Sequence, residues 1–108
     1  MKSGIQLQEA LPEFARELYE LLQSSKEQNL VTQLPELRIR RRCSCEDDFC
    51  ATFYTQFEPV ERPFPDHHCI VLEPTEGMII LDVVAGQIAE VEVLYRDDVR
   101  KPLRVLFP

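Results

Sequence analysis

The sequence predicts a single α+β domain over residues 1–108. An N-terminal amphipathic helix packs on one face of a mostly antiparallel sheet of about five strands, and a short helix follows at the C-terminal end. Three observations support this prediction. Apolar residues recur at helical spacing in the first third of the chain, they alternate with polar residues from Leu37 onward, and the β-rich segments follow one another through short turns. A chain of 108 residues can bury one modest core.

The first third of the chain has the pattern of an amphipathic helix. Its apolar residues recur at steps of three and four and therefore share one face; they are Leu11, Phe14, Ala15, Leu18, Leu21 and Leu22. Pro12 fits the first turn, where a missing N–H costs little. We expect a break at Ser24-Ser25, a second short helical piece that ends at Pro35, and loose residues 1–7.

Two β-rich segments, residues 37–45 and 51–57, flank a short polar loop. Pairing Cys43 with Phe53 gathers the apolar residues of both segments on one face, because alternate residues of a strand point to the same side. This pairing leaves a loop of odd length, so we expect a β-bulge within residues 46–50.

The second half of the chain predicts a loop and three strands. Residues 58–67 hold three prolines among polar residues and are expected to form the loop. A short strand follows over His68–Glu73, and the apolar segment Met78–Val84 is expected in the interior of the sheet. After a turn at Ala85-Gly86, the segment Gln87–Tyr95 returns as a strand whose alternate residues, including Tyr95, face the core.

We expect three aspartates, Asp82, Asp97 and Asp98, to have structural roles. Asp82 interrupts the apolar segment 78–84, and we interpret it as a strand-end or turn-facing residue with a hydrogen-bond partner. Asp97 or Asp98 is expected to cap a last short helix, which Pro102 limits in length or distorts.

Charge and hydropathy exclude several classes of function. The net charge is −7, and an acidic surface repels polyphosphate, so nucleic acid is not an expected partner. No apolar run approaches the roughly 18 residues of a membrane span, and the first residues lack the apolar stretch of a signal peptide. We therefore expect a cytoplasmic protein without a membrane partner, whose cysteines are mostly reduced. The sequence does not indicate the oligomeric state.

Three cysteines within eight positions, Cys43, Cys45 and Cys50, are the feature most open to unusual chemistry. They are candidate ligands of a structural zinc ion, which takes four nitrogen or sulfur ligands in a tetrahedron. The fourth ligand would be one of three downstream residues, His67, His68 or Cys69. The alternative is packing in a reduced core, which we favour because free cysteine is among the most buried residue types. A disulfide between Cys45 and Cys50 is sterically feasible but disfavoured in a reducing compartment.

The adjacent histidines His67 and His68 point to opposite faces if they lie in a strand, so they are not expected to act on the same atom. Their polar, proline-rich surroundings favour a solvated pair over a functional one. An enzyme that uses Cys50 or His68 is the least favoured hypothesis, because a nucleophilic thiolate needs an activating base and an orienting third group.

The segment Cys43–Thr55 resembles a Cys-x-Cys-x-Asp-x-x-Cys-x-x-Phe-Tyr segment of small uncharacterised bacterial proteins. Residues Gly77–Leu94 are similar to a hairpin of the same proteins, and the two stretches cover about half of the chain. The resemblance implies a bacterial cytosolic origin and carries no activity.

Small size, acidity and the lack of a convergent catalytic set predict a non-enzymatic protein-binding or regulatory module. One version is an inhibitor or immunity-type protein that binds a basic partner through the acidic segment Glu46–Glu76. The alternative is a small zinc-binding protein with a structural cysteine site within residues 43–69, zinc then being the one implied cofactor.

Overall fold

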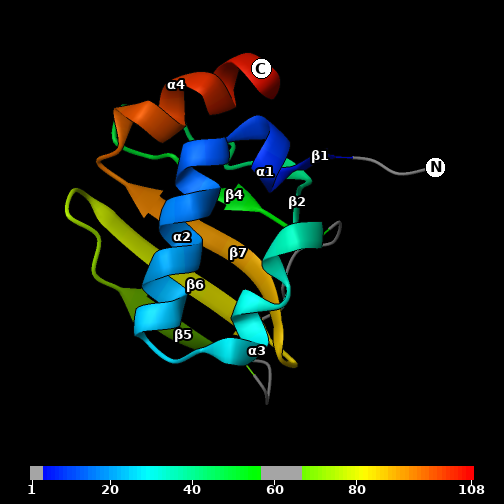
Figure 1. Cartoon of the computed structure of the whole chain (residues 1–108). Coiled ribbons are helices and arrows are strands. Elements are labelled where there is room, and N and C mark those ends of the chain that lie inside the picture. The colour runs from blue at the N-terminus through cyan, green and yellow to red at the C-terminus, as the bar shows by residue number, and fades with distance from the viewer. Residues whose placement is uncertain (1–3, 57–66) are drawn as a thin grey trace.

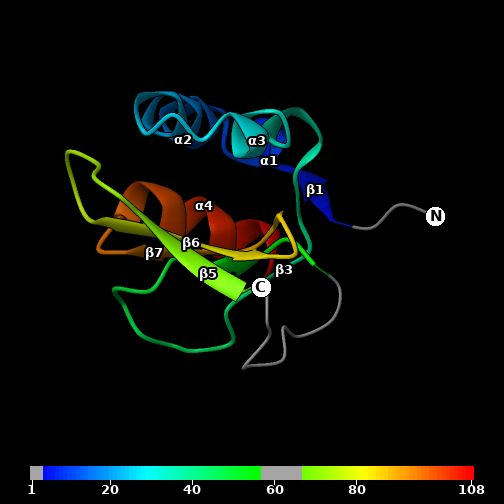
Figure 2. The same cartoon turned by 90° about the horizontal axis from the view of Figure 1, so that it is seen from below.

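A computed structural model describes residues 4–56 and 67–108. Within these residues it confirms the predicted α+β class, with helices packed on a five-stranded antiparallel sheet and a short helix at the C-terminal end. Helix α2 crosses one face of the sheet, and a second view shows α1, α2 and α3 gathered on that same side (Figures 1 and 2). In the described part of the chain, no helix is long and apolar enough to cross a membrane.

The N-terminal third forms β1 (Ile5–Gln6), α1 (Leu7–Ala10), α2 (Pro12–Ser24), α3 (Gln28–Val31) and the 3-10 helix η1 (Leu34–Glu36). The predicted helix therefore begins at Pro12 and ends at Ser24, and its apolar face is buried. The expectation of a loose N-terminal segment is wrong for residues 5–7. Ile5 pairs with Ile39 of β2 (Arg38–Ile39), and the side chain of Leu7 is fully buried in the core.

The sheet holds β3 (Arg41–Arg42), β4 (Phe53–Tyr54), β5 (His67–Leu72), β6 (Met78–Val84) and β7 (Gln87–Leu94). Their order is β3-β4-β7-β6-β5, and every neighbouring pair is antiparallel. Strand β6 lies between β7 and β5, as its apolar sequence predicts. Strand β5 begins and ends one residue earlier than expected, and the rest of the predicted loop at 58–67 lies outside the described residues.

The β3–β4 register differs by one residue from the prediction. Arg42, rather than Cys43, lies opposite Phe53, and the N–H of Cys43 donates to the carbonyl of Thr52 at 2.9 Å. A slip of one residue moves a side chain to the other face of a sheet. Cys43 therefore lies on the face opposite to the one into which Phe53 is buried.

A register irregularity in the sheet falls between Asp82 and Val83. Asp82 lies opposite Glu90, whereas Val83 lies opposite Ile88, so Ala89 is the extra residue of a β-bulge in β7. The bulge allows both Ile88 and Ala89 to be buried while Glu90 stays on the opposite face.

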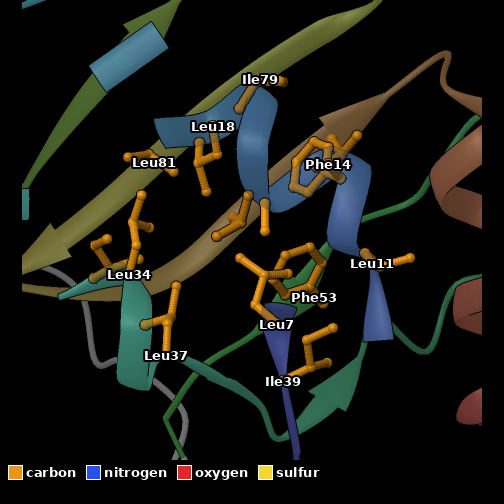
Figure 3. Packing of buried hydrophobic residues seen from close by; sticks show 14 of the residues in the cluster. Leu7, Leu11, Phe14, Leu18, Leu34, Leu37, Ile39, Phe53, Ile79 and Leu81 are labelled. Atoms are coloured by element: carbon orange, nitrogen blue, oxygen red, sulfur yellow. The ribbon is translucent and has the colours of Figure 1, made fainter. Parts of the chain in front are cut away.

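The core fills the space between the helices and the sheet (Figure 3). Phe53 on β4 is fully buried, and its ring meets Phe14 of α2 edge to face with 6.2 Å between the ring centroids. Helix α4 (Asp97–Leu106) completes this core with its buried residues Val99 and Leu103.

The connection from β7 to α4 differs from the prediction in two ways. Strand β7 ends at Leu94, and Tyr95 is 63% exposed with a φ of 60°, so Tyr95 does not face the core. Arg96 takes the N-cap position of α4 without a side-chain cap, so neither aspartate has the predicted capping role. Helix α4 continues past Pro102 to Leu106.

Arg96 links α2 to the start of α4. Its buried guanidinium donates to Glu17 Oε1 at 2.6 Å and to Asp98 Oδ2 at 2.9 Å. The hydrogen bond from Arg96 holds the pKa of Asp98 below its ordinary value of 3.8. Ionised Asp98 therefore stabilises the fold.

We expect Asp98→Asn to lower the free energy of unfolding at neutral pH by less than about 1 kcal/mol, because this carboxylate is 62% exposed and solvent screens the pair. A carboxyl with a depressed pKa contributes fully above its unfolded-state pKa, and the contribution is lost as the pH falls through the lower folded-state pKa. Urea unfolding of the variant and the natural protein should therefore differ at pH 7 and converge well below pH 3.8. A difference that persists in strong acid would show that Asp98 acts by another route.

Candidate functional site

The candidate site residues lie on the face of the sheet opposite to α1 and α2. Cys69, Asp82, Glu90 and Tyr54 follow one another across the strands as register partners. The next register row holds Leu81, Val91 and Phe53, all buried in the core. Because successive residues of a strand alternate in direction, the polar row faces away from the helices.

Cys43, Cys45 and Cys50 form one group, here called the thiol cluster. Their sulfur atoms all lie within 4.8 Å of one another. Cys43 extends β3, and Cys50 forms an isolated bridge with Leu94 of β7. Cys43 and Cys45 are half-buried and Cys69 is exposed, so the expectation that the thiols pack inside a reduced core is wrong for these three. Cys50 is the most buried member of the thiol cluster but does not belong to the hydrophobic core.

The loop that carries the thiol cluster is held from neighbouring elements. Arg104 of α4 donates to the carbonyl of Asp47 at 2.6 Å, and Arg42 donates to the carbonyl of Cys43 at 2.9 Å. The N–H of Tyr95 donates to the carbonyl of Phe49 at 2.8 Å, and the two aromatic rings stack at 5.5 Å. These contacts fix the loop and bring two guanidinium groups close to its backbone.

Cys45 and Cys50 have different tendencies to ionise. The hydrogen bond to the Cys50 sulfur, followed by burial, raises the pKa of Cys45 from 9.0 to about 11. Burial of Cys50 opposes its ionisation, but hydrogen bonds from the Thr52 backbone and from Cys45 outweigh burial and lower its pKa below 9.0. Cys50 is therefore the first thiolate of the pair, and Cys45 donates to it.

The three downstream candidates lie away from the thiol cluster. His67, His68 and Cys69 belong to β5, at the opposite edge of the sheet from β3. Three or four strand spacings, roughly 14–19 Å, separate them from the cysteine-bearing segments. The structure therefore does not bring a histidine or Cys69 to the thiol cluster as a fourth ligand, and it does not bring His68 to Cys50 as a base.

A second group, here called the His–Cys–Asp cluster, lies across β5 and β6. His67 Nε2 and Cys69 Sγ each lie 3.1 Å from Asp82 Oδ1, and the Cys69 thiol donates to that oxygen. The side chain of His67 is only 15% exposed, so the expectation of a solvated histidine pair is wrong for His67. His68, which points to the other face of β5, is exposed.

Sequence reasoning missed Asp82 as a member of a site. Its position is the middle of β6, opposite Cys69, rather than a strand end, and its side chain is fully buried. The predicted hydrogen-bond partner is present. The sequence did contain one indication of this site, an acidic residue within an apolar strand. A buried carboxylate requires hydrogen-bond donors or a cation close to it.

Glu90 and Glu92 of β7 continue this polar face. An oxygen atom of each lies within 4.8 Å of Asp82. Glu90 also lies opposite Tyr54, whose ring is covered by the guanidinium of Arg41 at 3.9 Å. Burial and then the charge of Glu90 raise the pKa of Tyr54.

Comparisons with known protein families, with curated proteins and with solved structures found no match. The functional argument therefore depends on the geometry of the chain's own side chains. The resemblance of Cys43–Thr55 to a segment of small bacterial proteins stays a prediction.

Proposed function

We propose that the protein binds zinc through Cys43, Cys45 and Cys50 and that the ion fixes the loop between β3 and β4. The observation that carries the proposal is the convergence of three sulfur atoms within 4.8 Å on a half-exposed face. Thiolates are preferred ligands of zinc, and thiols with access to solvent can exchange their protons for a metal.

The spacing of the sulfur atoms is close to that of a zinc site. Zinc–sulfur bonds of about 2.3 Å in a tetrahedron place the sulfur atoms roughly 3.8 Å apart. The thiol cluster reaches this arrangement through an inward movement of about 1 Å or less per sulfur atom. Within residues 4–56 and 67–108, no fourth His, Cys, Asp or Glu joins the three sulfur atoms, so the fourth coordination position is proposed to take water or a ligand from a partner.

The surroundings of the thiol cluster suit an anionic metal centre. Three thiolates and one divalent zinc ion carry a net negative charge, and the guanidinium groups of Arg42 and Arg104 are bonded to the same loop. Cys50, with its lowered pKa, supplies the first thiolate. Zinc must displace the proton of Cys45, whose pKa is raised to about 11, so the affinity is expected to rise with pH.

The deciding experiment measures zinc in protein purified without added metal and titrates the metal-free protein with Co²⁺, whose thiolate complexes absorb characteristically. Cys45→Ser is expected to remove one equivalent of bound zinc and to weaken Co²⁺ binding by more than about 100-fold. Removing a residue that only hydrogen-bonds to a metal ligand lowers metal affinity by about 10–100-fold, and removing the ligand itself should lower it further. Ser44→Ala is the matched control, since Ser44 is exposed and lies between the proposed ligands Cys43 and Cys45 in the sequence. Equal zinc in natural protein and Cys45→Ser would contradict the proposal.

A chelator tests the structural part of the proposal. Removal of zinc should speed hydrogen exchange at the amide of Tyr95, which bonds to the carbonyl of Phe49 in the loop. The amide of Val91 should be unaffected, because Val91 lies in β7, the central strand of the sheet, and its side chain is fully buried in the core.

Protein binding is the second candidate function. The residues Glu46, Asp47 and Asp48 are exposed on the same loop as the Phe49 ring, which is 44% exposed. An acidic, partly aromatic surface favours association with a basic partner. Part of the acidic segment expected to form this surface lies within 57–66, outside the described residues, so the partner stays a prediction.

A further inference from the structure

We infer that His67, Cys69 and Asp82 form a second metal site, separate from the thiol cluster and open to solvent. It would take Zn²⁺ or another divalent cation of intermediate softness. The inference goes beyond the proposed function, because it uses other residues on another edge of the sheet.

Geometry is the first support. One ligand atom from each residue lies within 4.8 Å of the other two. Both His67 Nε2 and Cys69 Sγ lie 3.1 Å from Asp82 Oδ1. A tetrahedral zinc ion with bonds of about 2.0–2.3 Å separates neighbouring ligand atoms by roughly 3.3–3.8 Å. The cluster therefore accepts the ion after opening by a few tenths of an ångström, once the thiol proton has left.

The strands hold the three ligands in place before any metal binds. His67 and Cys69 are two residues apart in β5, so they share a face, and Cys69 lies directly opposite Asp82 of β6. A site on paired strands keeps its geometry better than a site on a loop. His68 lies between the two ligands, and its side chain points to the other face.

Burial and charge are the second support. Asp82 is fully buried in the middle of an apolar strand. A carboxylate removed from water needs strong compensation, and a coordinated cation is one of the groups that supplies it. Two further carboxylates, Glu90 and Glu92, lie within 4.8 Å of Asp82 and favour positive charge at this place.

The composition of the cluster sets the class of metal and leaves one position open. One imidazole, one thiolate and one carboxylate form a mixed ligand set of the kind that zinc accepts. Cys69 is exposed at the edge strand, so the fourth position faces solvent. Sites with three protein ligands and a bound water are the open class of zinc site.

A nucleophilic Cys–His pair explains the same residues less well. The Cys69 thiol donates to a carboxylate oxygen rather than to the imidazole, and His67 Nε2 is directed to the same oxygen. Both side chains converge on Asp82, as ligands of one ion do, whereas a general base would have to meet the sulfur atom.

The test is a Zn²⁺ and Co²⁺ titration of the full chain and of three variants. The natural protein should bind two zinc ions. Cys69→Ser and His67→Gln should each bind one fewer, with the affinity of the lost site reduced by more than about 100-fold. His68→Gln is the matched control and should bind as the natural protein does. Cys69 is exposed, so its substitution preserves the fold, which circular dichroism and urea unfolding would verify.

The outcomes separate this site from the thiol cluster. If Cys45→Ser loses a zinc ion while Cys69→Ser and His67→Gln keep the natural stoichiometry, the second site is refuted and the thiol site stands. If Cys69→Ser and His67→Gln lose an ion while Cys45→Ser does not, the second site stands and the thiol site is refuted. An equal loss in His68→Gln and His67→Gln would mean unspecific binding to histidine and would overturn the inference.

Discussion

Replacing Phe53 with alanine is expected to lower the free energy of unfolding by about 3–5 kcal/mol. Phe53 is fully buried, and it contacts Phe14 across the space between β4 and α2. Alanine would remove the ring from both layers at once and leave a cavity that a rigid sheet closes only in part. Since domains of this size are stable by about 5–15 kcal/mol, much of the protein would unfold at moderate urea concentrations.

Phe49→Ala is the matched control for this prediction. It removes the same ring from a residue that is 44% exposed and stacked on Tyr95 at the surface. We expect a loss of no more than about 1.5 kcal/mol, the scale of one aromatic pair. Urea unfolding followed by circular dichroism measures both variants. Similar losses for the two would show that the α2–β4 contact is not the main support of the core.

Most of the fold could be predicted because the apolar pattern is simple. The steps of three and four from Leu11 to Leu22 place one face of α2 on the sheet, and the apolar run in β6 predicts a strand covered by neighbours. The N-terminal segment was harder to predict, since two isolated apolar residues, Ile5 and Leu7, have no period. Ile5 pairs with Ile39, and the N–H of Leu7 donates to the carbonyl of Leu37, so both partners lie far along the chain.

The β3–β4 register could not be predicted from the pattern. Cys43 counts as apolar in sequence analysis, so the pattern predicts that it pairs with Phe53 and completes the core face. In the structure, Arg42 takes that position because its guanidinium reaches the carbonyls of Phe107 and Cys43 at the end of the sheet. The Phe107 carbonyl comes from the residue that follows α4, far along the chain, so the local sequence around Arg42 does not indicate this contact.

The candidate site was predictable in its residues but not in their grouping. Six cysteines and histidines between positions 43 and 69 suggest one metal site when only spacing is considered. The strand order places β3 and β5 at opposite edges, which divides these residues into two groups. A carboxylate from β6, Asp82, then completes the second group. Strand order depends on the packing of the whole chain, so short-range spacing does not contain it.

Gly77→Ala is expected to lower the free energy of unfolding by about 3 kcal/mol, although it adds a single methyl group. Gly77 lies before β6 with a φ of +71°, a left-handed conformation that costs other residues about 1–2 kcal/mol. A Cβ atom there would lie 2.5 Å from the carbonyl oxygen of Leu94 and 2.7 Å from Cγ of Arg96. The oxygen belongs to the backbone of β7, so the strand itself must move. Displacing Arg96 also disturbs its ion pair with Glu17.

Gly86→Ala separates the two causes of this effect. Gly86 has a similar φ of +79°, but a Cβ atom added to it would meet nothing within 4 Å. Gly86→Ala should therefore lower the free energy of unfolding by only about 1 kcal/mol, the cost of placing alanine in the left-handed conformation. The remaining difference of about 2 kcal/mol between the two variants, measured by thermal or urea unfolding, reports the close approach of Gly77 to β7. Equal losses would mean that the turn before β6 relaxes freely, and Arg96 would then hold α2 and α4 together without support from that turn.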